Sequence, residues 1–156
     1  MKVGLDTSVL LRLLIGEPKR QAERAWRSMV EARSAGDETV VSDLVVSETY
    51  FALQHHYGVP KAKALEQLRA LFDFGQVSSL GCAAEVLKTP GLENAKPGFV
   101  DRLIHGGYVV GDVDRVLTFE KAAGQAWRCA RADRVGVSAG DDPYDRLRGI
   151  PRKGGR

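Results

Sequence analysis

The sequence predicts an α/β fold in which helices flank a mainly parallel central sheet. Short apolar runs of strand length alternate with longer segments of helical spacing, and that alternation is typical of parallel sheets. The 156 residues, 44% of them hydrophobic, suit one globular domain with a sizeable core. No stretch approaches the roughly 20 apolar residues that cross a membrane, so we expect no membrane contact.

The first strand is expected at Val3–Leu5, because this short apolar run directly precedes a helical segment. A helix follows over Ser8–Ile15, and Gly16-Glu17-Pro18 breaks it. The next helix, Lys19–Ala35, places Arg and Glu on its outer positions and ends at Gly36. This order forms one strand followed by two helices.

A second unit of the same kind begins at the β-branched run Thr39–Val41. The helix Asp43–Tyr57 has Ser42 or its own first residue as the N-cap, and Gly58 closes it. Proline suits the first turn of a helix, so a further helix is expected over Pro60–Phe74.

The second half of the chain alternates in the same way. The expected elements are a strand at Gln76–Leu80, a helix at Ala83–Lys88, a loop with two Pro and two Gly at Thr89–Gly98, a helix at Phe99–Tyr108 and a strand at Arg115–Phe119. The run Val135–Ser138 is compatible with a last short strand.

We expect the folded domain to span residues 1–139 and the remaining residues 140–156 to form a flexible basic tail. The tail lacks apolar periodicity and can bury little surface to offset the entropy of ordering it. Residues 128–156 contain eight Lys or Arg and four Asp or Glu, a net charge of +4, whereas the rest of the chain carries −1. A basic end on a nearly neutral body is compatible with contact to nucleic acid.

Asp6 and Glu48 are the two acids with the most informative positions. Asp6 directly follows the first strand, which is where α/β sheets place ligands; N-capping of the next helix explains it equally well. Glu48 falls on an apolar stripe with Leu44 and Phe51. A carboxylate buried there needs a partner or a cation, whereas a position facing water would need neither.

Asp101 and Glu120 complete the set of four acids. Asp101 lies in the first turn of its expected helix, where acids also act as caps. Glu120 follows the strand that ends at Phe119, which repeats the placement of Asp6; pairing with Lys121 or Arg115 is the alternative. Carboxylates gathered at one sheet edge repel one another unless a cation neutralises them, and their oxygens suit Mg²⁺ or Mn²⁺.

Four motifs, taken in this order, resemble a known family. They are Leu5-Asp6-Thr7-Ser8-Val9-Leu10, then Ser42, Glu48 and Leu53, then Phe99-Val100-Asp101-Arg102-Leu103-Ile104, then Thr118-Phe119-Glu120-Lys121. In order and spacing they look like the PIN-domain ribonucleases, and most like the small VapC-like toxins of bacterial toxin–antitoxin pairs. The resemblance covers roughly residues 1–125.

The resemblance implies a three-layer sandwich, dependence on Mg²⁺ or Mn²⁺, cleavage of RNA, a homodimer and inhibition by a cognate antitoxin protein. By position it assigns Asp6, Glu48 and Asp101 as metal ligands. Glu120 stands where the family usually has Asp, so its contact to the metal is either direct or through a water. Thr7, Ser8 and Thr118 are candidates for orienting the acids or water, with local backbone bonding as the alternative.

The leading hypothesis is therefore a metal-dependent endoribonuclease toxin, with all four acids catalytic. A catalytically weak PIN domain that binds RNA or protein is the competing hypothesis, because Glu120 departs from the family pattern. The first residues carry Asp6 and no signal-peptide cleavage site, so we expect a cytoplasmic protein. Cys82 and Cys129 lack the spacing of a zinc site or a disulfide framework and are expected to be inert thiols.

Overall fold

The computed structural model describes residues 1–114, 116–119 and 129–131. The chain divides into two compact units, Met1–Asp114 and Arg115–Arg156, and each is described by itself. The predicted boundary between residues 139 and 140 and the predicted strand Val135–Ser138 lie outside the described residues, so both remain predictions.

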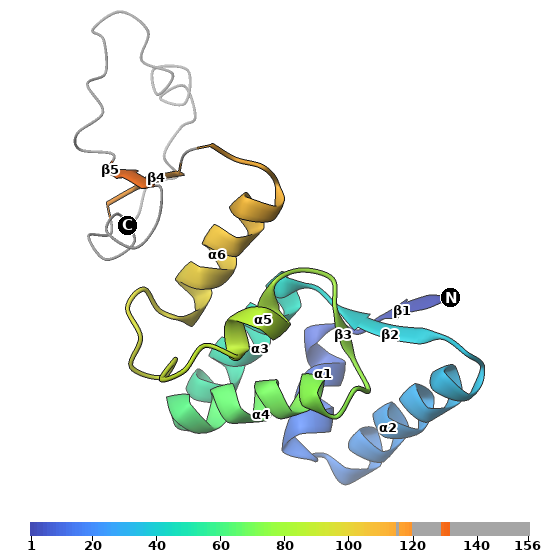
Figure 1. The fold of residues 1–156 in the computed structure, drawn as a ribbon. Coiled ribbons are helices and arrows are strands. Elements are labelled where there is room, and N and C mark those ends of the chain that lie inside the picture. The colour runs from blue at the N-terminus through green and yellow to red at the C-terminus, as the bar shows by residue number, and fades with distance from the viewer. Residues whose placement is uncertain (115, 120–128, 132–156) are drawn as a thin grey trace, which may run out of the picture. The chain divides into compact units, whose positions relative to one another are not determined.

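The first unit alternates strands and helices in the predicted order (Figure 1). Its elements are β1 (Lys2–Gly4), α1 (Thr7–Ile15), α2 (Lys19–Ser34), β2 (Glu38–Val41), α3 (Asp43–His55), α4 (Lys61–Asp73), β3 (Ser78–Ser79), α5 (Ala83–Leu87) and α6 (Phe99–Val110). The helix α1 ends at Gly16, whose φ of 78° is a left-handed conformation that glycine adopts without strain.

Three parallel strands form the sheet of this unit in the order β1-β2-β3. Val3 pairs with Thr39, and Val40 pairs with Ser78. The central strand β2 is buried at its last three positions, because neighbours pair with it on both sides. The predicted α/β fold with a parallel sheet and flanking helices is confirmed.

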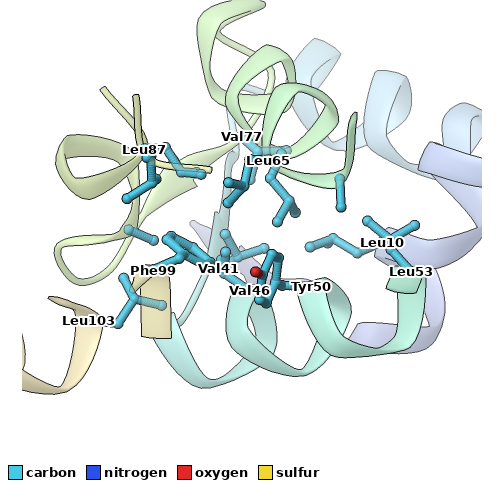
Figure 2. Close-up of a cluster of buried hydrophobic side chains, with 14 of the residues drawn as sticks. Leu10, Val41, Val46, Tyr50, Leu53, Leu65, Val77, Leu87, Phe99 and Leu103 are labelled. Atoms are coloured by element: carbon cyan, nitrogen blue, oxygen red, sulfur yellow. The ribbon is translucent and has the colours of Figure 1, made fainter. Parts of the chain in front are cut away.

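A single cluster of buried side chains fills the space between the sheet and the helices (Figure 2). The helix α3 contributes Val46, Tyr50 and Leu53 to it. Phe99 of α6 meets Tyr50 edge to ring, with 5.1 Å between the ring centroids, a geometry that aromatic pairs favour. The contact fixes the start of α6 against α3.

The strand β3 is shorter than the sequence predicts. The expected strand Gln76–Leu80 contains only the two paired residues Ser78 and Ser79, although Val77 is buried beside them. Gly75 turns the chain immediately before, with a φ of 64°. The strand is therefore confirmed only at its centre.

The second unit contains a parallel pair of strands, β4 (Val116–Thr118) and β5 (Cys129–Arg131). The strand predicted at Arg115–Phe119 is thus confirmed in its centre, whereas β5 was not predicted. Among the helices that the structure describes, none combines the length and apolar character needed to cross a membrane.

Candidate functional site

The carboxyl ends of the three parallel strands lie at one edge of the sheet. Backbone hydrogen bonds continue one residue past the strands, from Leu5 N to Val40 O at 2.9 Å and from Leu80 N to Val41 O at 2.8 Å. The segments that follow the three strands therefore leave the sheet from the same edge. In open α/β sheets this edge is where ligands bind.

Asp6 is the first acid at this edge, and it N-caps α1. Its Oδ1 accepts hydrogen bonds from Val9 N at 3.0 Å and from the Ser8 hydroxyl at 2.8 Å. The bond from Val9 N, followed by that from Ser8, holds the pKa of the Asp6 carboxyl below its ordinary value. The capping role is therefore present, and both of these bonds use the same carboxylate oxygen.

Glu48 is tied to the neighbour of Asp6. The Thr7 hydroxyl donates a hydrogen bond of 2.5 Å to Glu48 Oε2, and the two residues are 41 positions apart in the chain. A hydrogen bond to a carboxylate is stronger than one between neutral groups, so it fixes the Glu48 side chain beside the start of α1. The structure thus brings together the elements that carry two of the predicted acids.

Of the two positions left open for Glu48, the structure shows the one that faces water. Glu48 is exposed, as are Leu44 and Phe51 on the same stripe, at 78% and 46% of their surface. The buried residues of α3 include Val46 and Leu53 instead, and α3 packs against α1, α4 and α6. Because α3 is apolar over more than one face, the sequence alone is compatible with burial of either of two stripes of side chains. Glu48 faces water and does not carry the cost of burying a charge.

Asp101 lies in the first turn of α6, as predicted, and its side chain is exposed. Its Oδ2 accepts a hydrogen bond from Gly98 N at 3.2 Å, which caps the helix. The preceding Phe99 packs on Tyr50, two residues beyond Glu48. Packing therefore places the first turn of α6 beside α3, and no direct contact joins Asp101 to the other two acids among the hydrogen bonds of the described residues.

Asp43 has a role that sequence reasoning missed. Ser42 is the N-cap of α3, through a bond of 3.3 Å from Val45 N to its hydroxyl. The Asp43 carboxylate crosses instead to the segment after β3, where it accepts from Cys82 N and Ala83 N, each at 2.9 Å. The signal was available, because Asp43 follows β2 as closely as Asp6 follows β1.

The bridge made by Asp43 is closely packed. A Cβ added at Gly81 would overlap the Asp43 carboxylate, and one added at Gly106 would overlap the Cys82 sulfur. Burial, followed by the adjacent Asp43, raises the pKa of the Cys82 thiol to about 11. A thiol with this pKa stays protonated at neutral pH and is a poor nucleophile, as expected for Cys82.

Two predicted site residues belong to the second unit. Thr118 is the last residue of β4 and is half-buried. Glu120 lies outside the described residues, so its predicted role is untested.

Three exposed acids of the first unit have the donor chemistry that a divalent cation requires. Asp6, Glu48 and Asp101 offer hard carboxylate oxygens on exposed side chains, which is the donor chemistry of Mg²⁺ and Mn²⁺. Within residues 1–114, 116–119 and 129–131, no three His, Cys, Asp or Glu side chains lie together as a metal-binding group. Mg²⁺ is commonly held by only one or two carboxylates and keeps several waters, so Asp6 and Glu48 fit such an ion chemically.

Comparison with known proteins identifies the family of the chain. The model of the PIN domain family matches residues 3–104, a span that begins in β1 and ends after Asp101. No curated protein matches the chain. Since the matched span covers more than half of the sequence, the chain belongs to the PIN domain family.

Proposed function

We propose that this protein is a metal-dependent endoribonuclease that acts as the toxin of a toxin–antitoxin pair. PIN domains are generally nucleases and typically use divalent metals. The observation that carries the proposal is the hydrogen bond from Thr7 to Glu48. It joins the residue after Asp6 to the second predicted acid at the ligand-binding edge of the sheet.

In this proposal Asp6 and Glu48 hold the cation, and their neighbours set the positions of both carboxylates. Ser8 and Val9 N fix Asp6 Oδ1, and Thr7 fixes Glu48 Oε2. Groups held in this way need not reorganise during the reaction, and such preorganisation lowers the barrier. A bound Mg²⁺ or Mn²⁺ supplies a water of lowered pKa and stabilises negative charge on the phosphate.

Asp101 and Glu120 take supporting roles in the proposal. Asp101 lies in the first turn of α6, which Phe99 anchors on α3, and its exposed carboxylate is open to solvent on the same unit. Glu120 lies outside the described residues and is proposed as a catalytic acid on the family resemblance alone, with a side chain one methylene longer than that of the usual Asp. It is therefore the least essential of the four acids.

The proposed partners are an antitoxin protein and a second copy of the chain. A cavity of about 410 Å³ lies between α1, α2 and α4. It is bordered by Trp26 and Phe74, which are 53% and 77% exposed. Exposed aromatic side chains of this kind mark protein interaction sites, which supports a protein partner. Exposed Leu44 and Phe51 on α3 support a homodimer. An RNA substrate supports a cytoplasmic location.

The test is cleavage of RNA by the full-length protein. End-labelled single-stranded and structured RNAs are incubated with MnCl₂, with MgCl₂ and with EDTA, and the product ends are identified. We expect metal-dependent cleavage at internal positions of the RNA, which leaves 5′-phosphates on the downstream products. The Asp6→Asn variant is the matched control, because asparagine still caps α1.

The possible results separate the proposal from its competitor. Cleavage that persists in EDTA or in Asp6→Asn would contradict the proposed mechanism. RNA that is bound but never cut would favour a PIN domain that acts only as a binding module. The toxin role requires in addition that expression of the wild type arrests growth and that expression of Asp6→Asn does not.

A further inference from the structure

A cavity of about 450 Å³ lies between β1, α1 and α2. Its volume is within the range of about 300–1,000 Å³ found for sites that bind small molecules. One wall is apolar and includes Val3, Val9 and Met29. Such a wall accepts the face of an aromatic ring, and a nucleobase is a flat ring with polar edges.

Two arginines line the same cavity, and they are held differently. Arg12 is fixed by hydrogen bonds from its guanidinium to Gln21 Oε1 at 2.6 Å and to the Tyr57 hydroxyl at 3.1 Å. Arg24 lines the cavity from α2 and is exposed. Across the described part of the chain, no hydrogen bond or ion pair engages the Arg24 guanidinium, so it is available to an anion. Guanidinium groups bind phosphate through paired hydrogen bonds.

The cavity adjoins the candidate site through Ser8. The Ser8 side chain lines the cavity, and its hydroxyl donates to Asp6 Oδ1 at 2.8 Å. A ligand in the cavity therefore lies one side chain away from the first predicted catalytic acid. Neither the family match nor the arrangement of the acids assigns a role to this cavity.

We propose that the cavity binds one nucleotide of single-stranded RNA next to the phosphate that is cut. The base lies against the wall of Val3, Val9 and Met29, and Arg24 holds its phosphate. The cavity then selects unpaired RNA, because a base within a duplex is stacked and cannot enter it. This inference rests on the proposed function, since it takes RNA as the ligand.

Binding is measured with the full-length protein in EDTA, so that no cleavage is needed for a signal. The probe is a fluorescently labelled single-stranded RNA of ten nucleotides with mixed sequence. Arg24→Gln is compared with Arg27→Gln, which removes an exposed charge from the same helix but does not line the cavity. We expect Arg24→Gln to weaken binding by about tenfold, as the loss of one charge-assisted hydrogen bond requires.

The salt dependence gives a second readout of the same contact. Loss of one phosphate contact to a single strand should make the slope of log K against log salt shallower by about 0.7. Arg27→Gln should leave that slope closer to that of the wild type. Equal affinities and equal slopes for the two variants would overturn the assignment of Arg24.

A filled cavity tests the position of the base. Ser28→Phe introduces a ring into the cavity from an exposed position of α2, and Val30→Phe adds a ring to the same helix outside it. We expect Ser28→Phe to bind the RNA at least about tenfold more weakly than Val30→Phe, with thermal midpoints alike. Equal binding by two folded variants would overturn the proposal.

Failure of this inference is distinguishable from failure of the proposed function. Cleavage by the wild type, together with RNA binding that neither Arg24→Gln nor Ser28→Phe weakens, would remove the cavity and leave the nuclease. Binding that both variants weaken, in a protein that never cuts RNA, would keep the cavity and remove the nuclease.

Discussion

Asp6 and Asp43 follow neighbouring parallel strands at the same edge of one sheet, yet their carboxylates make different hydrogen bonds. Asp43 uses both oxygens to accept the backbone N–H groups of Cys82 and Ala83, 39 and 40 residues away in sequence. Asp6 accepts hydrogen bonds from Ser8 and Val9 N in the first turn of α1, both at its Oδ1. One acid joins distant segments, and the other remains exposed beside Thr7 and Glu48.

This difference teaches that position after a strand does not by itself identify a catalytic acid. A carboxylate whose hydrogen bonds are all made to one distant segment acts as a structural cross-link, because its removal leaves buried donors unpaired. A carboxylate that is held locally and remains exposed can bind a ligand. The two acids should therefore respond oppositely to the same substitution.

The largest expected effect is the loss of nuclease activity in Asp6→Asn. We expect its rate of RNA cleavage to fall by about 1,000-fold, close to 4 kcal/mol in the barrier. Its free energy of unfolding should change little, since asparagine is as good an N-cap as aspartate. Steady-state cleavage and urea unfolding measure the two quantities, and a loss of stability that matches the loss of activity would make Asp6 a structural acid.

The opposite result is expected for Asp43. Asp43→Ala should lower the free energy of unfolding by about 3 kcal/mol, because at least two backbone donors lose a charged acceptor. Asp43→Asn keeps one oxygen acceptor, so its free energy of unfolding should lie between those of Asp43→Ala and the wild type. Urea unfolding gives the values, with the exposed Asp73→Ala as a control expected within about 0.5 kcal/mol of the wild type.

Activity of the folded fraction completes the comparison. Asp43→Asn that remains folded should cut RNA at nearly the wild-type rate. A folded Asp43→Asn as inactive as Asp6→Asn would show that Asp43 also belongs to the reaction.

A smaller effect on the rate of cleavage is expected from Thr7→Val. The valine side chain has nearly the same shape as that of threonine but no hydroxyl. Without the hydrogen bond to Glu48 Oε2, the rate of cleavage should fall by about 10–100-fold, as for other groups that orient metal ligands. Thr7→Ser retains the hydroxyl and should recover most of the rate. Equal activity of the valine and serine variants would show that the Thr7 bond does not position Glu48.

The smallest effect concerns pH. The hydrogen bonds from Val9 N and Ser8 hold the folded-state pKa of Asp6 below its ordinary value of 3.8. The cap therefore stabilises the fold above that value and loses its contribution as the pH falls through the lowered folded-state pKa. The thermal midpoint of the wild type should therefore fall relative to that of Asp6→Asn over this range, whereas the offset between the two should stay constant near neutrality. A wild type that gains stability relative to Asp6→Asn as the pH falls would contradict the direction of the shift.

The sequence by itself determined the alternation of strands and helices, and it determined most boundaries of the first unit. Gly16, Gly58 and Pro60 are local signals, and local backbone preferences act within a few residues. The motif around Asp6 was also visible, because an acid after a short apolar run needs no tertiary information. Asp101 was placed correctly in the first turn of α6 for the same reason.

Only the tertiary structure decided which of the elements that carry these acids lie together and which side of α3 is buried. Packing of α3 against α1, α4 and α6 buries Val46 and Leu53 and leaves Glu48 exposed beside Thr7, although the sequence offers two apolar stripes on that helix. The bridge from Asp43 to Cys82 joins residues 39 positions apart, and the cavity between α1 and α2 exists only where the two helices pack. Contacts of this kind depend on how far-separated segments fit together, and sequence periodicity describes only the faces of each element by itself.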